Sequence, residues 1–232
     1  MPKIPMAAPK LPYESQTYPW MCGAAALAMV YRSLGRNDTQ TEIWKRVGWQ
    51  NPQRQWRARS HLLARDALAQ GLSALVVQVR DPWLVLERCR DLSLRVILNH
   101  HWQQESEAGH YSVLVNLDED NVWLHDPNLG PNRCLTRPEW LRLWNANPLG
   151  SEIIGQVLVA ISPDPVPLSP CPLCSRVPAA TLECTCGRVV ALEPGGMLGC
   201  LAAGCPMRAW TQIFCPGCDH GWRHWPAAPV LP

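Results

Sequence analysis

Cysteine is the most unevenly distributed residue of this 232-residue chain, and its spacing limits the possible folds more than any other feature. Three of the eleven cysteines precede residue 170, and the other eight form four closely spaced pairs: Cys171 and Cys174, Cys184 and Cys186, Cys200 and Cys205, Cys215 and Cys218. Before them, residues 162–170 carry proline at nearly every second position, which continues neither a helix nor a central strand. We therefore expect a first domain over residues 1–163, a Pro-rich linker over 164–170, and a cysteine-rich module over 171–232.

The four cysteine pairs predict two structural zinc ions, because a structural zinc ion takes four thiolate or imidazole ligands. Three pairings are possible. The spacing slightly favours the sequential one, in which the first two pairs hold one ion and the last two hold the other. An alternative places the two Cys-Pro-x-Cys knuckles on one metal, as in a zinc ribbon. We expect short ribbon hairpins over residues 188–192 and 209–214, and a module that depends on metal for much of its folding energy. His220 and His224 follow the last knuckle as bystanders, because eight cysteines already saturate two sites.

Charge and hydropathy exclude several functional classes. The net charge is +2, from 21 basic and 19 acidic residues, and residues 164–232 carry four of each. A neutral tail argues against a grip on nucleic-acid phosphates. No run of about 18 uncharged apolar residues predicts a membrane span, and the first ten residues lack the apolar stretch of a secretory signal. We therefore expect no nucleic-acid partner, no membrane span and a cytoplasmic location.

The first 163 residues have an α+β pattern, with helices first and an antiparallel sheet after them. Residues 22–34 combine strong helix formers on nearly every side and end before Gly35, which predicts a buried helix. Residues 111–117 and 122–125 flank a polar turn at 118–121 and predict a hairpin. The remaining expected elements are helices over 39–46, 57–70, 81–89 and 137–145, and strands over 72–80, 94–98 and 153–161.

One cysteine stands where a nucleophile needs to be. Cys22 opens the predicted buried helix, where the helix dipole and free N–H groups stabilise a thiolate. Gln16 lies six residues upstream, and its amide can donate to a developing oxyanion beside the N–H of Cys22. His110 opens one strand of the predicted hairpin and Asp126 closes the other, so the two side chains should lie together as a base and its orienting acid.

Other residues of suitable type lack a comparable setting. His100 and His101 compete for the role of base, but neither has a matching acid at a comparable place. Cys89 and Cys134 have no partner of catalytic type nearby and are predicted to be structural or incidental.

Three segments carry a family resemblance: residues 16–29 (QTYPWMCGAAALAM), 109–115 (GHYSVLV) and 125–127 (HDP). Over roughly residues 8–162 the chain resembles the bacteriocin-processing, or double-glycine, cysteine peptidases, which are papain-like. The resemblance implies Cys22 as nucleophile, His110 as general base and acid, Asp126 as orienting acid and Gln16 as oxyanion donor. It also implies a bacterial source, a peptide or protein substrate and cleavage after small residues such as Gly-Gly. Met21 departs from the acidic or amide residue that commonly precedes the nucleophile in that family.

Two other functions are compatible with the same residues. A toxin-like effector delivered by a secretion system would use the same chemistry on a foreign protein, and a catalytically inactive adaptor would bind peptides without cutting them. In the cysteine-rich module, Trp210, Trp222 and Trp225 suggest a docking surface for a partner protein, with ordinary packing as the alternative. The sequence Gly195-Gly196 predicts a hairpin turn, and self-cleavage there is a further hypothesis.

Overall fold

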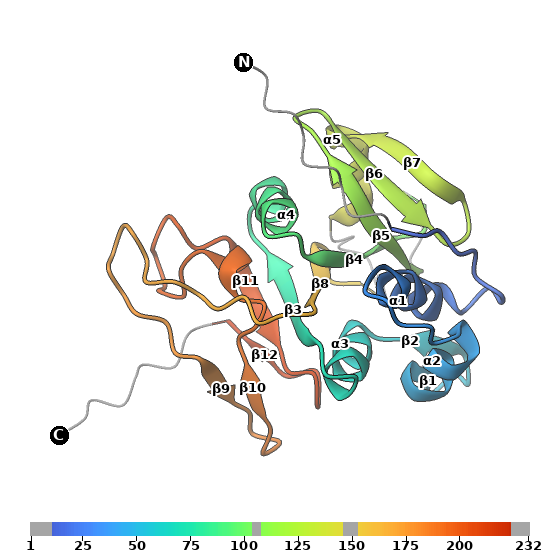
Figure 1. Cartoon of the computed structure of the whole chain (residues 1–232), viewed down its shortest axis with the longest axis horizontal. Coiled ribbons are helices and arrows are strands. Elements are labelled where there is room, and N and C mark those ends of the chain that lie inside the picture. The colour runs from blue at the N-terminus through green and yellow to red at the C-terminus, as the bar shows by residue number, and fades with distance from the viewer. Residues whose placement is uncertain (1–10, 104–107, 146–152, 224–232) are drawn as a thin grey trace.

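The chain was analysed as a computed structural model that describes residues 11–103, 108–145 and 153–223 (Figure 1). His224, Trp225 and the first ten residues therefore lie outside the described residues. The helices, in chain order, are α1 (Cys22–Ser33), α2 (Gln40–Val47), α3 (Ser60–Ala69), α4 (Pro82–Asp91), α5 (Arg137–Trp144) and the short 3-10 helix η1 (Gly196–Leu198). Within the described ranges, no helix is long and apolar enough to cross a membrane.

An eight-stranded sheet runs through the whole molecule. Its strand order is β12-β11-β3-β8-β4-β5-β6-β7, and every neighbouring pair is antiparallel. The strands are β3 (Ser73–Val79), β4 (Arg95–His101), β5 (Gly109–Leu117), β6 (Asn121–Asp126), β7 (Gly130–Thr136), β8 (Val157–Ser162), β11 (Trp210–Phe214) and β12 (Gly221–Trp222). Two separate hairpins complete the fold: β1 (Gly48–Gln50) with β2 (Trp56–Ala58), and β9 (Thr181–Glu183) with β10 (Val189–Ala191). The expected α+β class is confirmed.

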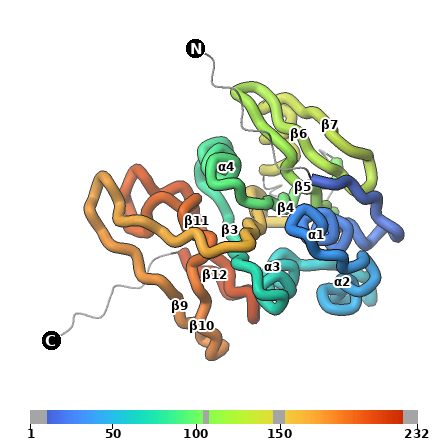
Figure 2. Tube along the Cα trace, in the orientation of Figure 1, coloured from blue at the N-terminus to red at the C-terminus, as the bar shows by residue number. Residues whose placement is uncertain are grey.

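The two faces of the sheet bury alternate residues of the same strands, as the pleat requires. On β3, Ala74 and Val76 belong to one apolar core, while Leu75 and Val77 belong to the other. The first core packs against α1, α2 and α3, and the second against α4, α5 and the cysteine-rich segment. Figure 2 shows α1 and α2 at the right and the cysteine-rich segment, in orange and red, at the left, with α4 between them. The sheet is therefore the middle of three layers.

Local sequence explains where the helices start. Thr39 caps α2 through a capping box, in which Glu42 N–H donates to the Thr39 hydroxyl and Thr39 N–H donates to the Glu42 carboxylate. Asp81 accepts from Leu84 N–H at 3.2 Å at the start of α4. The expected helix over 57–70 is shorter than predicted, because its first residues form β2 and the helix begins at Ser60. Strand β7 was not expected, because it is mostly exposed at the edge of the sheet and its sequence lacks the alternation of apolar and polar residues that marks a strand.

The cysteine-rich segment is built into the sheet. The expected strand over 188–192 is β10, whose partner is β9, whereas the expected strand over 209–214 is β11, which pairs with β3 and β12. The expected hairpin at residues 209–214 is β11 with β12, and β11 also joins β3 of the main sheet, because apolar Trp210 and Ile213 pack on the core beneath β3. The Pro-rich residues 164–170 contain no helix or strand, and Val166 and Leu168 pack against the same core.

The Gly-Gly sequence does not form a hairpin turn. Gly195 is buried ahead of η1, and its N–H donates to Val166 O at 2.7 Å. A Cβ added at Gly195 would lie 2.3 Å from Leu192 O, so close approach of backbone explains the glycine. A peptidase needs an extended and accessible chain, which this packed position does not offer.

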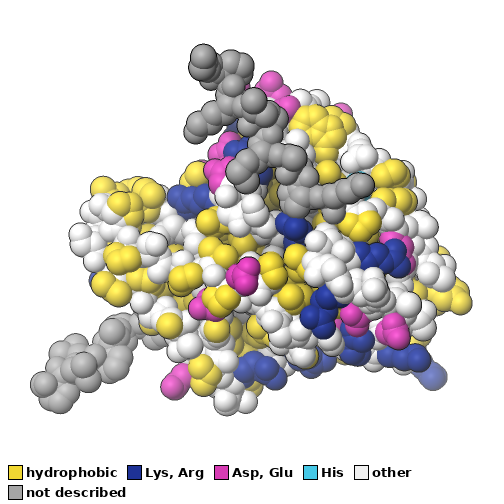
Figure 3. Space-filling view, in the orientation of Figure 1, with side chains coloured by type: hydrophobic (Ala, Val, Ile, Leu, Met, Phe, Trp, Pro, Cys, Tyr) yellow, Lys and Arg dark blue, Asp and Glu magenta, His cyan; other side chains and the backbone are white. Residues whose placement is uncertain are grey.

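Surface charge differs between the two ends of the molecule. On the face drawn in Figure 3, basic side chains gather around α2 and α3, whereas the cysteine-rich end shows mostly apolar and uncharged side chains. This agrees with the low and balanced charge of residues 164–232.

Candidate active site

Cys22 is the first residue of α1, as the sequence predicts. It is half-buried, and the chain enters the helix through a turn in which Ala25 N–H donates to Met21 O at 2.9 Å. The helix behind it is buried from Gly23 to Tyr31 and packs against β5, which fixes the position of the sulfur. A Cβ at Gly23 would lie 2.9 Å from Ala58 Cβ, so the glycine permits this close packing. The thiol therefore sits at the positive end of a rigid helix dipole.

His110 pairs with Asp126 and lines the same cleft as Cys22. Nε2 of His110 donates to Oδ1 of Asp126 at 2.8 Å, and the nearby Cys22 side chain contributes to raising the pKa of His110. The two residues lie on β5 and β6, which pair with each other, so the hairpin brings them together. Trp102 packs edge-on against the His110 ring at a centroid distance of 4.8 Å and shields it from water. The expected pairing of His110 with Asp126 agrees with the geometry, and Cys22 lines the same cleft as His110.

The surroundings hold Asp126 in its charged form. Its side chain is fully buried, and Oδ1 accepts from the N–H groups of Asn128 at 3.0 Å and Leu129 at 3.1 Å. Arg133 on β7 donates to Oδ2 at 3.2 Å. Burial by itself raises the pKa of Asp126, but the bond from His110 and the backbone donors outweigh it and hold the pKa well below its usual range. Asp126 is thus a fixed negative charge behind the imidazole.

The same pairing changes the ionisation of His110. Burial lowers its pKa, whereas the hydrogen bonds to Asp126 and Cys22 raise it, and the net effect raises the pKa of His110 to about 9. The imidazolium form of His110 is therefore favoured at neutral pH.

Gln16 lies beside the site through its backbone. Its N–H donates to Pro127 O at 2.8 Å, directly after Asp126. Its side-chain Nε2 donates to Pro19 O at 3.2 Å, which uses one of its two N–H donors. The structure thus places the Gln16 backbone next to Pro127, which follows Asp126, with one amide N–H engaged by the chain itself.

The two histidines that compete for the role of base, His100 and His101, bond groups other than Cys22. His100 is fully buried, with Nδ1 against His101 O at 2.7 Å and Nε2 against the Ser112 hydroxyl at 2.9 Å. Burial, followed by the neighbouring His110, lowers the pKa of His100 to about 3, so this ring stays neutral. His101 is also buried, and its Nε2 lies 3.1 Å from Asn145 O. Neither ring bonds the Cys22 thiol in the described structure.

The surroundings of Cys89 and Cys134 agree with the prediction that these two cysteines are structural or incidental. Cys89 is buried, its thiol contacts the Met197 sulfur at 3.4 Å, and burial raises its pKa. Cys134 is exposed on the edge strand β7.

Cys22 and His110 line a cleft of about 640 Å³. Aromatic side chains of Trp20, Trp49 and Trp56 line it, and its walls come from the α1 approach, the β1–β2 hairpin, the start of α3 and β5. Phe214 and Asp219 of the cysteine-rich segment complete the wall. Local sequence carries no signal for these two residues, because they reach the cleft only through the long-range pairing of β11 with β3.

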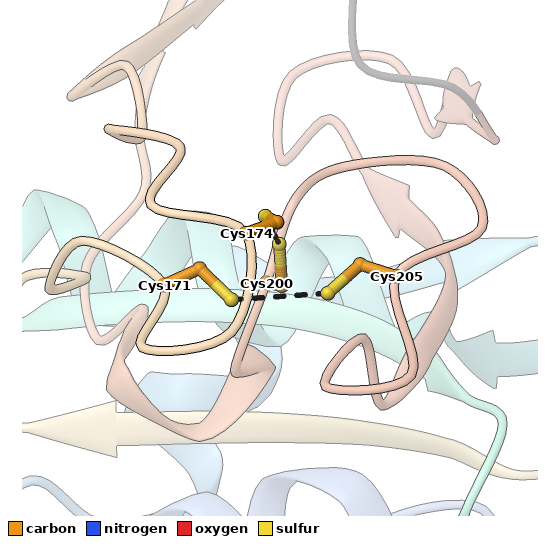
Figure 4. Close-up of side chains that lie close together, drawn as sticks. All are labelled: Cys171, Cys174, Cys200 and Cys205. Carbon is orange, nitrogen blue, oxygen red and sulfur yellow. Dashed lines mark hydrogen bonds between the residues drawn. The ribbon is translucent and has the colours of Figure 1, made fainter.

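The eight cysteines of the tail form two clusters of four, each with its sulfur atoms within 4.8 Å of one another. The first holds Cys171, Cys174, Cys200 and Cys205, whose side chains converge from two loops in Figure 4. The second holds Cys184, Cys186, Cys215 and Cys218. The favoured sequential pairing is therefore wrong, as is the pairing of the two Cys-Pro-x-Cys knuckles. Alternate pairs combine instead, because β11 carries the last knuckle back to the β9–β10 hairpin.

The sulfur spacing fits a tetrahedral ion. Zinc–sulfur bonds of about 2.3 Å at tetrahedral angles place sulfurs about 3.8 Å apart, whereas a disulfide requires about 2.05 Å. The contacts between Cys171 and Cys205 (3.8 Å) and between Cys174 and Cys200 (3.6 Å) match the first value. In the second cluster, Cys184 lies 3.5 Å from Cys218 and Cys186 lies 3.8 Å from Cys215. Both clusters could therefore hold a metal ion.

Backbone donors and burial act in opposite directions within the clusters. The N–H of Cys174 is the main cause that lowers the pKa of Cys171 to about 6. Burial raises the pKa of Cys200 and Cys215 to about 12, although Ala202 N–H and Gly217 N–H each donate to these sulfurs at 3.3 Å. Loading four thiolates would therefore need a cation at the centre, and binding would release protons.

The described tryptophans of the tail are buried or half-buried, which does not favour the predicted docking surface. Trp210 is buried, and its indole N–H donates to Cys200 O at 2.9 Å. Trp222 is half-buried in β12. The expectation that Trp210 forms a docking surface is thus wrong, because it fills the core between β11 and the first cluster.

Solved structures share the fold of about two thirds of the chain. The peptidase domain of Streptococcus ComA, described as a bi-functional ABC transporter involved in quorum sensing, aligns with a TM-score of 0.53 at 16% identity, over 67% of this chain and 100% of that one. A double glycine motif protease from an AMS/PCAT transporter, solved in complex with its leader peptide, gives 0.53 at 17% identity over 68% and 94%. A putative C39-like peptidase from Bacillus anthracis gives 0.52 at 12% identity over 66% and 94%.

Two sequence comparisons also find similar proteins. An uncharacterized protein of Methanothermobacter thermautotrophicus is 31% identical over 115 residues, which span 50% of this chain and 70% of that protein. The model of the peptidase C39 family matches residues 10–149, more than half of the chain, and includes Cys22, His110 and Asp126. The chain belongs to the peptidase C39 family.

Proposed function

We propose that this protein is a papain-like cysteine peptidase that hydrolyses peptide bonds through Cys22, His110 and Asp126. One observation carries the proposal: a thiol at the start of a buried helix lines the same cleft as an imidazole, and that imidazole bonds a fully buried carboxylate. Nucleophile, base and orienting acid are the three roles that covalent hydrolysis requires.

The proposed reaction has two halves. His110 takes the proton of Cys22, and the thiolate attacks the scissile carbonyl carbon to form an S–C bond. The His110 imidazolium then donates its proton to the leaving amine as the C–N bond breaks. In the second half His110 deprotonates a water molecule, which attacks the thioester and releases the carboxylic acid and the thiol. Asp126 keeps the ring oriented and stabilises its cationic form throughout.

Gln16 is the proposed oxyanion donor together with the N–H of Cys22. In support, the Gln16 backbone is bonded to Pro127, next to Asp126, and its amide retains a second N–H beside the bond to Pro19. An amide donor of this kind stabilises the negative charge that develops on the carbonyl oxygen.

Small residues such as Gly-Gly are the proposed preference on the acyl side of the cut. Trp20 and Trp102 line the cleft with the Cys–His pair, and bulky aromatic walls favour a substrate without side chains. The double glycine motif protease with the same fold gives independent support, since it was solved with a leader peptide bound.

Residues 171–232 are the proposed zinc-binding module, with one structural zinc ion in each four-cysteine cluster. When bound, each ion would crosslink two loops through four metal–sulfur bonds. The loops around the first cluster have few apolar contacts of their own. We also propose a cytoplasmic location, because eight thiols intended for metal need a reducing compartment. Cell fractionation with an antibody against the chain tests the location.

The decisive experiment compares neo-termini. Lysates or leader-peptide libraries are incubated with the wild-type chain or with Cys22→Ala, and new N-termini are counted by mass spectrometry. The proposal expects cuts that need Cys22 and that survive in Cys134→Ala, a matched control that removes an exposed thiol outside the cleft. A thiol probe that labels Cys22 no faster than Cys134, with no Cys22-dependent cuts, would instead identify a peptide-binding adaptor.

A further inference from the structure

The last cysteine knuckle borders the substrate cleft directly. Phe214 precedes Cys215, and Asp219 follows Cys218, and both flanking residues line the cleft with Cys22. The knuckle turn is fixed by the Asp219 N–H, which donates to Cys215 O at 3.0 Å. Asp219 has a φ of 65°, a left-handed conformation that Asp tolerates better than most residues. The second cysteine cluster thus sets where the Asp219 carboxylate stands.

Asp219 reaches across to the start of α3. Its carboxylate lies 3.1 Å from His61 Nδ1 and 3.9 Å from Arg59 Nη1. Among the described residues that line the cleft, Asp219 is the only carboxylate. The contact therefore joins the cysteine-rich segment to the catalytic part at the rim of the cleft.

Arg59 is held in place from two sides. Its guanidinium lies over the Trp49 ring at 3.9 Å from the centroid, a cation–π contact, while Asp219 approaches its edge. The distance of 3.9 Å to Asp219 is a charge contact that is too long for a hydrogen bond. The side chain of Arg59 is 46% exposed and lines the cleft. A planar group with five N–H donors is thus oriented, charged and available.

A guanidinium in this setting matches one substrate chemistry. A carboxylate can accept two parallel N–H bonds from the planar fork, which a lysine ammonium cannot offer. The stacking on Trp49 removes much of the rotamer freedom that such an interaction would otherwise cost. Asp219 limits the movement of the guanidinium along the ring plane.

We propose that Arg59 is a specificity-determining residue that binds a carboxylate of the peptide in the cleft, an Asp or Glu side chain, and that Asp219 of the cysteine-rich segment is its positioning residue. This rests on the proposed function only in placing a peptide in the cleft. The cysteine-rich segment is then part of the substrate site, in addition to covering the sheet.

Direct binding tests this without turnover. The full-length chain carrying Cys22→Ala is titrated with decapeptides that contain Gly-Gly and a single Glu moved through the other positions, each paired with its Gln counterpart. Binding is followed by isothermal calorimetry. We expect the Glu peptide to bind about three- to fivefold more tightly at one position, the size of a partly exposed ion pair. Arg59→Gln removes this Glu preference, and Arg59→Lys restores only part of it.

The role of Asp219 is tested by the same quantity, the ratio of the dissociation constants of the Gln and Glu peptides. Asp219→Asn lowers the Glu preference about twofold in the Cys22→Ala chain and has no further effect when Arg59→Gln is also present. Arg54→Gln is the matched control, because Arg54 is exposed in the adjacent β1–β2 turn, outside the residues that line the cleft, and loses the same charge. It leaves the ratio unchanged.

Opposite outcomes overturn the inference. Equal binding of Glu and Gln peptides at every position, no binding of any peptide, or a preference that survives Arg59→Gln excludes Arg59 as the determinant. An unchanged or stronger preference in Asp219→Asn excludes the positioning role. Cleavage of the same peptides by the wild-type chain is measured separately. Binding selectivity without cleavage would therefore remove the proposed peptidase function and leave this inference standing.

Discussion

The two faces of the central sheet are covered by different means. On one face, α1 to α3 bury a continuous apolar core to which the cysteine-rich segment contributes Phe214. On the other face, the segment contributes many of the core residues, among them Leu192, Met197, Trp210 and Ile213, yet its own local cluster holds little more than cysteines. The helical face is thus stabilised by its own packing, whereas the segment needs crosslinks before its side chains can pack. The comparison shows that the helix carrying Cys22 packs on one face of the sheet, whereas most of the core residues of the cysteine-rich segment pack on the other.

Metal removal should have the largest effect, and it should separate the two faces. A strong zinc chelator is expected to unfold residues 171–222, since structural zinc supplies about 10–16 kcal/mol of apparent binding free energy in small zinc-finger peptides. The amides of β9 to β12 should lose protection in hydrogen exchange measured by mass spectrometry. Those of α1 to α3 should keep most of theirs, because their core lies on the other face.

The contrary outcome is equally clear. If the chelated chain keeps β11 protected, or if purified protein contains no bound metal, the cysteine clusters do not support the fold as argued. Cys134→Ser is the control for cysteine loss by itself, because Cys134 lies outside both clusters.

Removing the nucleophile should affect only the catalytic part. Cys22→Ala is expected to lower peptide hydrolysis by at least about 10³-fold, as loss of a nucleophile does in other covalent hydrolases. Its melting temperature should stay within a few degrees of wild type, because the sulfur is half-buried at the cleft. The measurement is hydrolysis of a fluorogenic Gly-Gly peptide alongside a thermal melt. Residual activity close to wild type would exclude Cys22 as nucleophile.

Sequence patterns were sufficient for the catalytic part because its signals are local. The apolar helix after Cys22, the alternation in β5 and the polar turn before β6 each follow from residues within one element. The hairpin then brings His110 and Asp126 together without any long-range information.

The cysteine-rich part was predicted less well because its geometry is set by distant pairing. The spacing of the cysteines predicts two four-ligand clusters but leaves the pairing open, and the pairing follows from β11 joining β3. The same contact buries Trp210 and carries Asp219 to the cleft, and neither consequence has a signal in the local sequence. Arg133 was missed for a related reason, since β7 is a polar edge strand.

The orienting acid should matter less than the nucleophile. Asp126→Asn keeps the size of the side chain but removes the charge behind His110, and we expect kcat/KM to fall about 10²-fold with KM little changed. The buried Arg133 contact would lose its anionic partner, so a modest loss of stability is also expected. Steady-state kinetics check the first effect and a denaturant titration the second. Wild-type kcat/KM in Asp126→Asn would show that His110 needs no carboxylate.

The pH dependence is the smallest effect, and it tests the link between Asp126 and His110. The pKa of His110 is raised from 6.5 to about 9, so the imidazolium that would protonate the leaving amine in the proposed reaction is present at neutral pH and is lost above pH 9. We expect kcat/KM to fall about tenfold per pH unit above that value. Because the folded pKa exceeds the unfolded one, the pairing stabilises the fold fully below pH 6.5, and this stabilisation is lost as pH rises through 9. In Asp126→Asn the bond that raises the pKa is weakened, so the alkaline limb should move to lower pH. A limb that stays at pH 9 in this variant would mean that the thiolate of Cys22 alone holds the proton on His110, and the buried carboxylate would then only orient the ring.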